Sequence, residues 1–186
     1  MRNSIILAAV LLVLGAVTAR AQNLALSTNA VGYLEYGTLN LEASLSVARQ
    51  WTVTAGAQYN PFHFKAGEDQ HDVNHRQRLL SAGARWWPWH VFSGWWVAGK
   101  LQYQEYNFGG VRSPETVEGD RIGLGASVGY TYMLAKHFNL ELGIGGWGGA
   151  DFFTRYECPV CGLTLDKGTK PFILPNDITV AISYIF

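Results

Sequence analysis

The sequence predicts an all-β protein, an antiparallel up-and-down transmembrane β-barrel of about eight strands preceded by a cleaved signal peptide. Three observations predict this class. The chain begins with a short basic and apolar leader, it has no later apolar run of about 18 residues, and it repeats segments in which apolar and polar or small residues alternate. A barrel crosses a membrane with strands of about 10 alternating residues, so it needs no long apolar run.

The leader has the layout of a secretory signal peptide. Arg2 supplies a positive charge, residues 5–17 form an uncharged apolar run, and Ala19, Arg20 and Ala21 fit a small-x-small cleavage site. The apolar run is shorter than the roughly 20 residues of a membrane-spanning helix. We therefore divide the chain into a signal peptide, residues 1–21, and an outer-membrane β-barrel domain, residues 22–186.

The charge balance predicts no nucleic-acid partner. The whole chain has 14 basic and 14 acidic residues, and loss of Arg2 and Arg20 with the leader would leave 12 basic residues against the same 14 acids. Nucleic-acid binding domains present a basic surface, which this composition does not supply, and no run of like charges forms a tail.

Seven segments alternate residue by residue, as expected for strands with one apolar and one polar face. In the first of them, Leu41, Ala43 and Leu45 share one face, and Glu42 and Ser44 take the other. The seven segments are 40–48, 51–59, 80–86, 95–103, 121–132, 139–146 and 177–186, and a weaker eighth covers 24–33. An even count near eight agrees with the rule for bacterial outer-membrane barrels.

The connections between these segments alternate in length. Residues 48–50, 88–91 and 134–137 are short connections, residues 60–75, 107–119 and 154–170 are long ones, and residues 34–39 are intermediate. Outer-membrane barrels have short periplasmic turns and long extracellular loops. We therefore expect the long loops outside the cell and both termini in the periplasm.

Aromatic residues gather at both ends of the alternating segments, as in the girdles that border a membrane. The girdle candidates are Trp51, Trp86, Trp95, Phe138 and Phe186 beside the short turns, and Tyr59 and Tyr103 beside the long loops. Trp51 and Tyr59 share a face of one segment. At about 3.3 Å per residue and a tilt of about 40°, they are about 20 Å apart along the membrane normal, close to the height of an outer-membrane apolar band. Outer-membrane lipid is therefore an expected partner.

The polar face predicts a network of charges inside the barrel. The expected members are Glu42, Arg85, Lys100, Arg121 and Glu141, and we expect the two acids to pair with the three bases. Isolated buried charges are costly, so they must pair and form hydrogen bonds. A barrel of about eight strands is just wide enough for its side chains to fill. A solid polar plug is therefore favoured over a narrow polar pathway or proton relay.

Two loop motifs could carry chemistry. Cys158 and Cys161 form the pair in "ECPVCG", which fits a local disulfide in an exported protein or half of a metal site. The loop "FHFKAGEDQHDVNH" holds His63, His71 and His75, which could complete such a site or remain solvated. Four ligands are normal for structural zinc, and only two thiols exist. No catalytic constellation and no cofactor motif appears, so we expect no enzyme activity and no cofactor.

The final segment, "DITVAISYIF", alternates and ends on Phe186. It resembles the C-terminal signal that the outer-membrane barrel assembly machinery recognises, and that resemblance implies this machinery as a partner.

Several stretches together resemble one family of small exported proteins. They are "STNAVGYLEYGTLNLEASLSVARQWTV", "YNPFHF", "GARWWPW", "YNFGGV" and "RYECPVCG". The chain resembles the family filed as domain of unknown function 3575, known chiefly from Bacteroidetes-type Gram-negative bacteria. The resemblance covers nearly all of residues 22–186 and implies an outer-membrane barrel without implying an activity.

Two classes of function remain open at this point. The favoured one is a non-enzymatic outer-membrane barrel that displays extracellular loops for envelope structure, adhesion or binding of a surface protein or polysaccharide. The alternative is a small outer-membrane enzyme or metal-binding surface protein that uses Cys158, Cys161 and the nearby histidines.

Overall fold

The computed structural model describes residues 24–64, 73–109, 115–157 and 163–186, and nearly all of them lie in one antiparallel β-sheet. The residues expected to form the signal peptide lie outside the described part. The long strands are β1 (Leu24–Asn29), β2 (Leu39–Ala48), β3 (Trp51–Asn60), β5 (Val73–Trp86), β6 (Gly94–Gly109), β7 (Thr116–Ala135), β8 (Phe138–Tyr156) and β9 (Thr164–Ile185). A two-residue strand, β4 (His63–Phe64), extends the line of β3 and pairs with β5.

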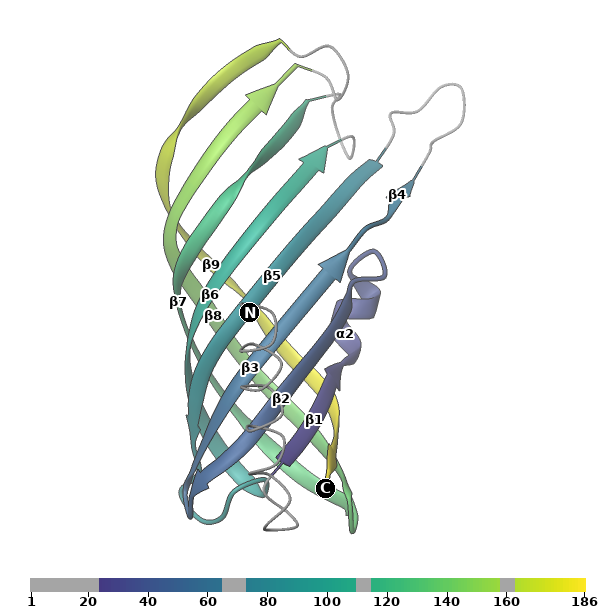
Figure 1. Ribbon diagram of the computed structural model, residues 1–186, viewed down its shortest axis with the longest axis vertical. Helices are drawn as coiled ribbons and strands as arrows, with labels where there is room; N and C mark the ends of the chain where they lie inside the picture. The colour runs from purple at the N-terminus through teal and green to yellow at the C-terminus, as the bar shows by residue number, and fades with distance from the viewer. Residues whose placement is uncertain (1–23, 65–72, 110–114, 158–162) are drawn as a thin grey trace, which may run out of the picture.

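The sheet closes on itself. Each long strand pairs with the next one along the chain, β3 pairs with β5, and β9 returns to pair with β1 (Figure 1). Closure removes the unpaired edges that an open sheet would present. The predicted antiparallel barrel of about eight strands is therefore confirmed.

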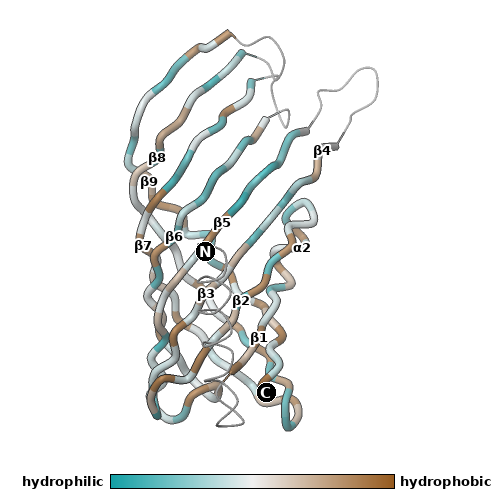
Figure 2. The backbone as a smooth tube through the Cα atoms, viewed as in Figure 1, coloured by the Kyte–Doolittle hydropathy of each residue, from teal (hydrophilic) through white to brown (hydrophobic). Residues whose placement is uncertain are grey.

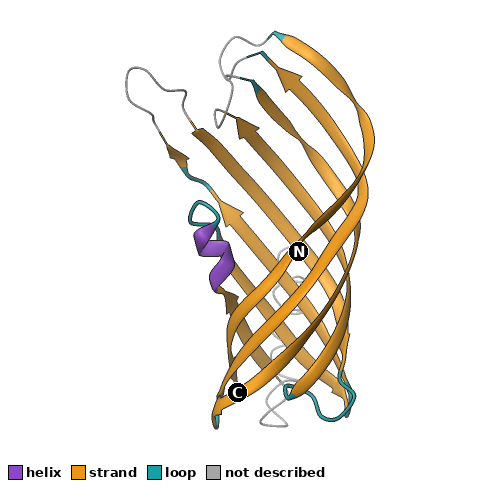
Figure 3. Ribbon diagram, turned by 180° about the vertical axis from the view of Figure 1, so that it is seen from behind, coloured by secondary structure: helices purple, strands orange, loops and turns teal. Residues whose placement is uncertain are grey.

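The strands differ greatly in length. β1 has 6 residues, β2 and β3 have 10 each, and β9 has 22. The longer strands consequently rise above the shorter ones on one side (Figures 1 and 3). We call this rise the upper wall, defined as residues 73–78 of β5, 104–109 of β6, 116–121 of β7, 151–156 of β8 and 164–170 of β9. The remaining strand residues form the lower barrel. Much of the upper wall was expected as long loops, and that expectation is wrong.

A short helix, α2 (Ala30–Leu34), follows β1 where the sequence predicted the rest of a weak strand. Asn29 caps it, since the Asn29 Oδ1 accepts a hydrogen bond from the Val31 backbone N–H at 3.2 Å. The chain then turns through Tyr36 and Gly37, which both have positive φ. Among the described residues, no helix is long and apolar enough to cross a membrane.

Alternation decides which side chains face inward. On β6, Trp96 and Gln102 point into the barrel and are 1% and 5% exposed, whereas Trp95 and Leu101 point outward and are each 51% exposed. Figure 2 shows apolar residues spread through the lower barrel and mostly hydrophilic residues along β5 and β6 of the upper wall. The apolar surface is therefore concentrated on the outside of the lower barrel.

A small apolar cluster seals the lower end of the interior. Trp87 and Phe92, from the turn between β5 and β6, pack with Trp96 and are all at most 6% exposed. The Trp87 Nε1–H donates to the Thr52 hydroxyl at 3.1 Å. Phe92 has a φ of 62°, so the turn adopts a left-handed backbone conformation there. The turn folds under the strands and closes the barrel mouth.

Candidate functional site

The outer face of the lower barrel carries a band of exposed apolar side chains, here called the apolar band. Leu124 and Ile144 are 71% and 67% exposed. Other large members are Leu41, Val53, Leu80, Leu101, Val128, Leu142 and Ile182. A soluble monomer rarely exposes contiguous apolar patches larger than a few hundred Å². The apolar band is therefore a candidate surface for contact with an apolar medium or partner.

Aromatic side chains accompany the apolar band at its two ends. The seven girdle candidates lie on the outer face and are between 38% and 51% exposed: Trp51, Tyr59, Trp86, Trp95, Tyr103, Phe138 and Phe186. Ring contacts join several of them to neighbours. Trp95 meets Tyr130 edge to face at 5.3 Å, and Tyr184 lies between Phe138 and Phe186 at 5.1 and 4.9 Å.

Inside the lower barrel, one arginine bridges two acids from different strands. Arg85 of β5 bonds to Glu42 of β2 through one guanidinium nitrogen and to Glu141 of β8 at 2.6 Å through another. The guanidinium also lies over the Trp96 ring, 4.5 Å from its centroid. Because β2, β5 and β8 are separate parts of the ring of strands, this triad crosses the barrel interior.

A second ion pair lies beside the triad. Lys100 Nζ of β6 is 2.6 Å from Asp177 Oδ2 of β9, rather than from Glu42 or Glu141. A cavity of about 60 Å³ remains among these side chains. Since one water molecule occupies about 30 Å³ in the liquid, this space has room for about two waters. The interior of the lower barrel is consequently filled rather than open.

A third group of charges lies higher in the interior, where Asp151 is completely buried. Asp151 Oδ1 accepts a hydrogen bond from the Tyr106 hydroxyl at 2.7 Å, and Asp151 Oδ2 is 3.3 Å from Arg121 Nε and 3.7 Å from Lys170 Nζ. The Arg121 guanidinium also stacks over the Tyr106 ring at 3.9 Å. Arg121 therefore pairs with Asp151, not with Glu42 or Glu141.

Sequence reasoning missed Asp151 and Asp177 as members of the interior network. Asp177 is the first residue of the last alternating segment, and its inward position follows from the same parity as Thr179 and Ala181. Asp151 lies beyond the end of the recognised segment 139–146. Extending that alternation through Gly149 to Asp151 would have found it, because odd-numbered residues of β8 face inward.

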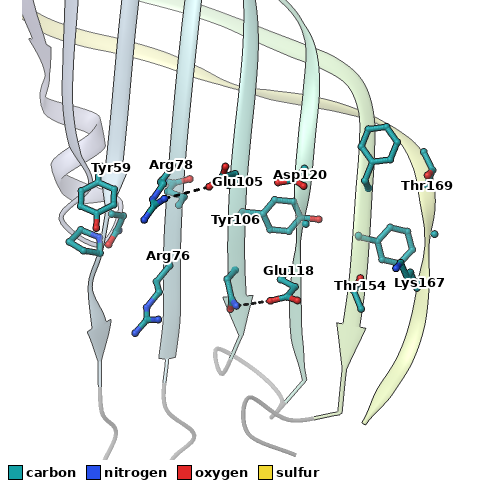
Figure 4. A pocket seen from close by; sticks show the side chains of 18 residues that line it. Tyr59, Arg76, Arg78, Glu105, Tyr106, Glu118, Asp120, Thr154, Lys167 and Thr169 are labelled. Carbon is teal, nitrogen blue, oxygen red and sulfur yellow. Dashed lines mark hydrogen bonds and ion pairs between the residues drawn. The ribbon is translucent and has the colours of Figure 1, made fainter. Parts of the chain in front are cut away.

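The outer face of the upper wall contains a groove of about 930 Å³, here called the outer groove (Figure 4). Its lining includes charged side chains from β5, β6, β7 and β9, namely Arg76, Arg78, Glu105, Glu118, Asp120 and Lys167. They lie at alternate positions in register with the outward apolar residues of the same strands. Tyr59 and Phe152 also line the groove and supply aromatic surface.

Tyrosine and asparagine side chains hold the carboxylates of the outer groove. Glu118 accepts hydrogen bonds from the Tyr156 hydroxyl at 2.7 Å and from Asn107 Nδ2 at 3.3 Å. The Tyr103 hydroxyl lies 3.2 Å from Asp120 Oδ1 and 3.3 Å from Glu105 Oε1. The hydrogen bond to Glu118 raises the pKa of the Tyr156 hydroxyl, because it favours the protonated phenol.

The structure describes only part of the cysteine and histidine motifs, so the metal site stays a prediction. Cys158, Cys161 and His71 lie outside the described residues. The His75 ring is stacked between Tyr36 and Phe108, and its Nε2 is 3.5 Å from Glu35 Oε1. Within the described part of the chain, no group of three or more His, Cys, Asp or Glu side chains could hold a metal ion.

The comparisons with known proteins agree with the resemblance seen in the sequence. No curated protein matches the chain. One family model matches residues 7–186, and its description is "Protein of unknown function (DUF3575)". The match covers almost the entire chain and includes all of the barrel. The protein therefore belongs to the DUF3575 family, whose function is unknown.

Proposed function

We propose that the protein is a non-enzymatic β-barrel of the outer membrane, which holds its upper wall and the adjoining loops outside the cell for envelope structure, adhesion or partner binding. The observation that carries this proposal is the inversion of polarity in the lower barrel. Charged and amide side chains such as Arg85, Glu141 and Gln102 are buried inside, while Leu124 and Ile144 are exposed outside. That distribution suits a protein surrounded by lipid.

The dimensions and the ends of the barrel support the same environment. Trp51 and Tyr59 lie at opposite ends of β3. At about 3.3 Å per residue and a strand tilt of about 40°, they are about 20 Å apart along the barrel axis. This separation approaches the roughly 25 Å height of an outer-membrane apolar band. The turns at one end, such as Arg49–Gln50, are short, and the opposite end carries the polar upper wall. We infer that the short turns face the periplasm and the upper wall faces the exterior.

The filled interior supports display rather than transport. The triad of Arg85, Glu42 and Glu141 crosses the barrel, and Trp87 and Phe92 close its lower end. A barrel of about eight strands has an interior that its own side chains can fill. The parts left to contact a partner are then the upper wall and the loops that join its strands, which a surface protein or polysaccharide could reach.

Cell fractionation combined with semi-native gel electrophoresis tests this proposal. We expect the protein in the outer-membrane fraction, with faster migration before boiling than after, because a closed barrel stays compact in detergent. A soluble periplasmic protein serves as the fractionation control. Recovery of the chain in the soluble periplasm, with identical migration before and after boiling, would contradict the proposal.

A further inference from the structure

The outer groove begins where the apolar band ends. Moving up the outer face of β5 toward the upper wall, the next outward residue after Leu80 is Arg78. On β7 the next outward residue above Ile122 is Asp120. If the apolar band marks the hydrocarbon region, as the proposed function holds, the outer groove lies at the level of the lipid headgroups in the outer leaflet. Its occupant is therefore expected to be part of a lipid.

The acceptors of the outer groove already have donors from the protein. Glu118 is held by Tyr156 and Asn107, and the single proton of the Tyr103 hydroxyl can be donated to Asp120 or to Glu105. Figure 4 shows these acids on the central strands of the groove, β6 and β7. The carboxylates therefore have little need of a ligand to supply donors.

The donors of the outer groove, in contrast, have few acceptors within the described part of the chain. Arg78 reaches Glu105 only at 3.8 Å, and its side chain is 68% exposed. Among the described residues, no acceptor forms an ion pair or hydrogen bond with the side chain of Arg76 or Lys167. Figure 4 shows these cations on the two flanks, with the arginines on β5 and Lys167 on β9. As far as the described residues go, the groove therefore has hydrogen-bond donors at its two sides that can bind an anionic ligand.

We propose that the outer groove binds the phosphorylated sugar headgroup of an outer-leaflet glycolipid. Phosphate oxygens would accept hydrogen bonds from Arg76, Arg78 and Lys167, which are favoured donors for phosphate. The C–H faces of the sugar rings would pack against Tyr59 and Phe152, while the acyl chains run down along the apolar band. A volume of about 930 Å³ is in the range of small-molecule sites, about 300–1,000 Å³.

Native mass spectrometry of the full barrel folded in detergent tests this inference. The probes are a rough-type lipopolysaccharide with its phosphates intact, the same material after dephosphorylation, phosphatidylglycerol, and a soluble sugar phosphate. The test variant is Arg76→Gln with Lys167→Gln, and the matched control is Arg49→Gln with Lys136→Gln, which removes two exposed cations at the short-turn end. Heat-modifiable migration is checked for every variant, so a failure to fold is recognised separately.

We expect the phosphorylated glycolipid to bind about tenfold more tightly than the dephosphorylated form, and the test variant to lose about tenfold in affinity while the control keeps it. Equal binding of both glycolipid forms, or equal losses in both variants, would overturn the inference. Equal binding of phosphatidylglycerol would mean charge attraction alone, and equal binding of the soluble sugar phosphate would exclude a lipid source; either result overturns it. The proposed function is judged by fractionation, so the two can fail independently.

Discussion

The lower barrel and the upper wall share the long strands β5 to β9, yet they differ in sheet closure and in which side chains are exposed. In the lower barrel each strand has two neighbours, polar side chains are buried inside, and apolar side chains are exposed outside. In the upper wall the sheet is open, and residues 164–171 of β9 are exposed on both faces. β9 carries Lys167 in the upper wall and Pro171 directly after it, and both residue types protect an exposed strand edge from pairing with other chains.

This comparison teaches that the same strand tolerates different changes at different heights. Substitutions in the lower barrel disturb either a polar interior that its side chains largely fill or an apolar outer surface. Substitutions on the outer face of the upper wall change side chains that remain exposed, such as Arg78. Matched changes in the two regions can therefore sharpen the boundary between them or show that it does not exist.

Arg85→Ala should have the largest effect. It would leave the buried Glu141 and the partly buried Glu42 without their shared cation, and breaking a buried pair costs about 3–5 kcal/mol. Arg78→Ala in the upper wall removes an exposed, solvent-screened pair with Glu105 and should cost about 0–1 kcal/mol. Urea unfolding in detergent micelles, followed by tryptophan fluorescence, measures both. Similar losses in the two variants would remove the distinction between the regions.

Leu124→Lys should have the next largest effect, because it places a charge on the apolar band, one outward position below Ile122. A lysine on the lipid face costs about 2–4 kcal/mol at the midplane and less toward the interfaces. Thr169→Lys adds the same charge to the outward face of the upper wall, where both faces are exposed, and should assemble normally. The measurement is the fraction of each variant recovered as heat-modifiable barrel in the outer membrane. Normal assembly of Leu124→Lys would show that the apolar band does not face lipid.

Gly129→Ala should have an intermediate effect. The added methyl group would collide with the Trp96 ring and the Leu142 carbonyl oxygen, so the filled interior would have to shift at a cost of about 1–3 kcal/mol. Gly168→Ala is the matched change in the upper wall, where the nearest atoms belong to the Phe153 ring at 3.8 Å. The midpoint temperature of the gel shift compares the two variants. An unchanged midpoint for Gly129→Ala would mean that the interior has spare volume.

Reduction of the disulfide that we expect between Cys158 and Cys161 should have the smallest effect on stability, because a disulfide over so short a loop restricts the unfolded chain only slightly. The same two cysteines test the proposed location of the upper wall outside the cell. We expect a membrane-impermeant thiol reagent to label whole cells only after reduction. Labelling that requires a chelator would favour metal binding, and labelling confined to broken cells would reverse the proposed orientation.

The lower barrel could be predicted because its two faces meet different surroundings. Leu41 and Leu45 face outward while Glu42 and Ser44 face inward, so alternation is visible in the sequence. The same contrast disappears in the upper wall. Both faces of residues 164–171 are exposed, no apolar alternation is needed, and the sequence there reads as a loop. Apolar alternation therefore cannot predict how far a strand continues beyond the apolar band.

The partners inside the barrel could not be predicted for a different reason. Parity shows that Arg85, Lys100 and Arg121 face inward, but pairing across the interior depends on the stagger between strands. The register of β9 places Asp177 opposite Gly145 and brings it to Lys100, and a bulge between Gly145 and Trp147 shifts the pairing above that point. Neither the stagger nor the bulge has a signature in a single sequence. The helix α2, with five residues, is also too short to show a periodicity.

The pairing between β1 and β9 has a consequence for the order in which the barrel assembles and unfolds. β9 pairs with β8 over most of its 22 residues. It pairs with β1 only through residues 181–185, which lie opposite residues 25–29 of β1. Asn29 clamps the upper end of this seam through Ile178 and Val180, and the Phe186 backbone N–H donates to the Leu24 carbonyl at its lower end. The long strands can therefore form one continuous sheet before the ring is complete. We expect the β1–β9 pairing to form last when the barrel assembles. We also expect it to open first under force or in denaturant.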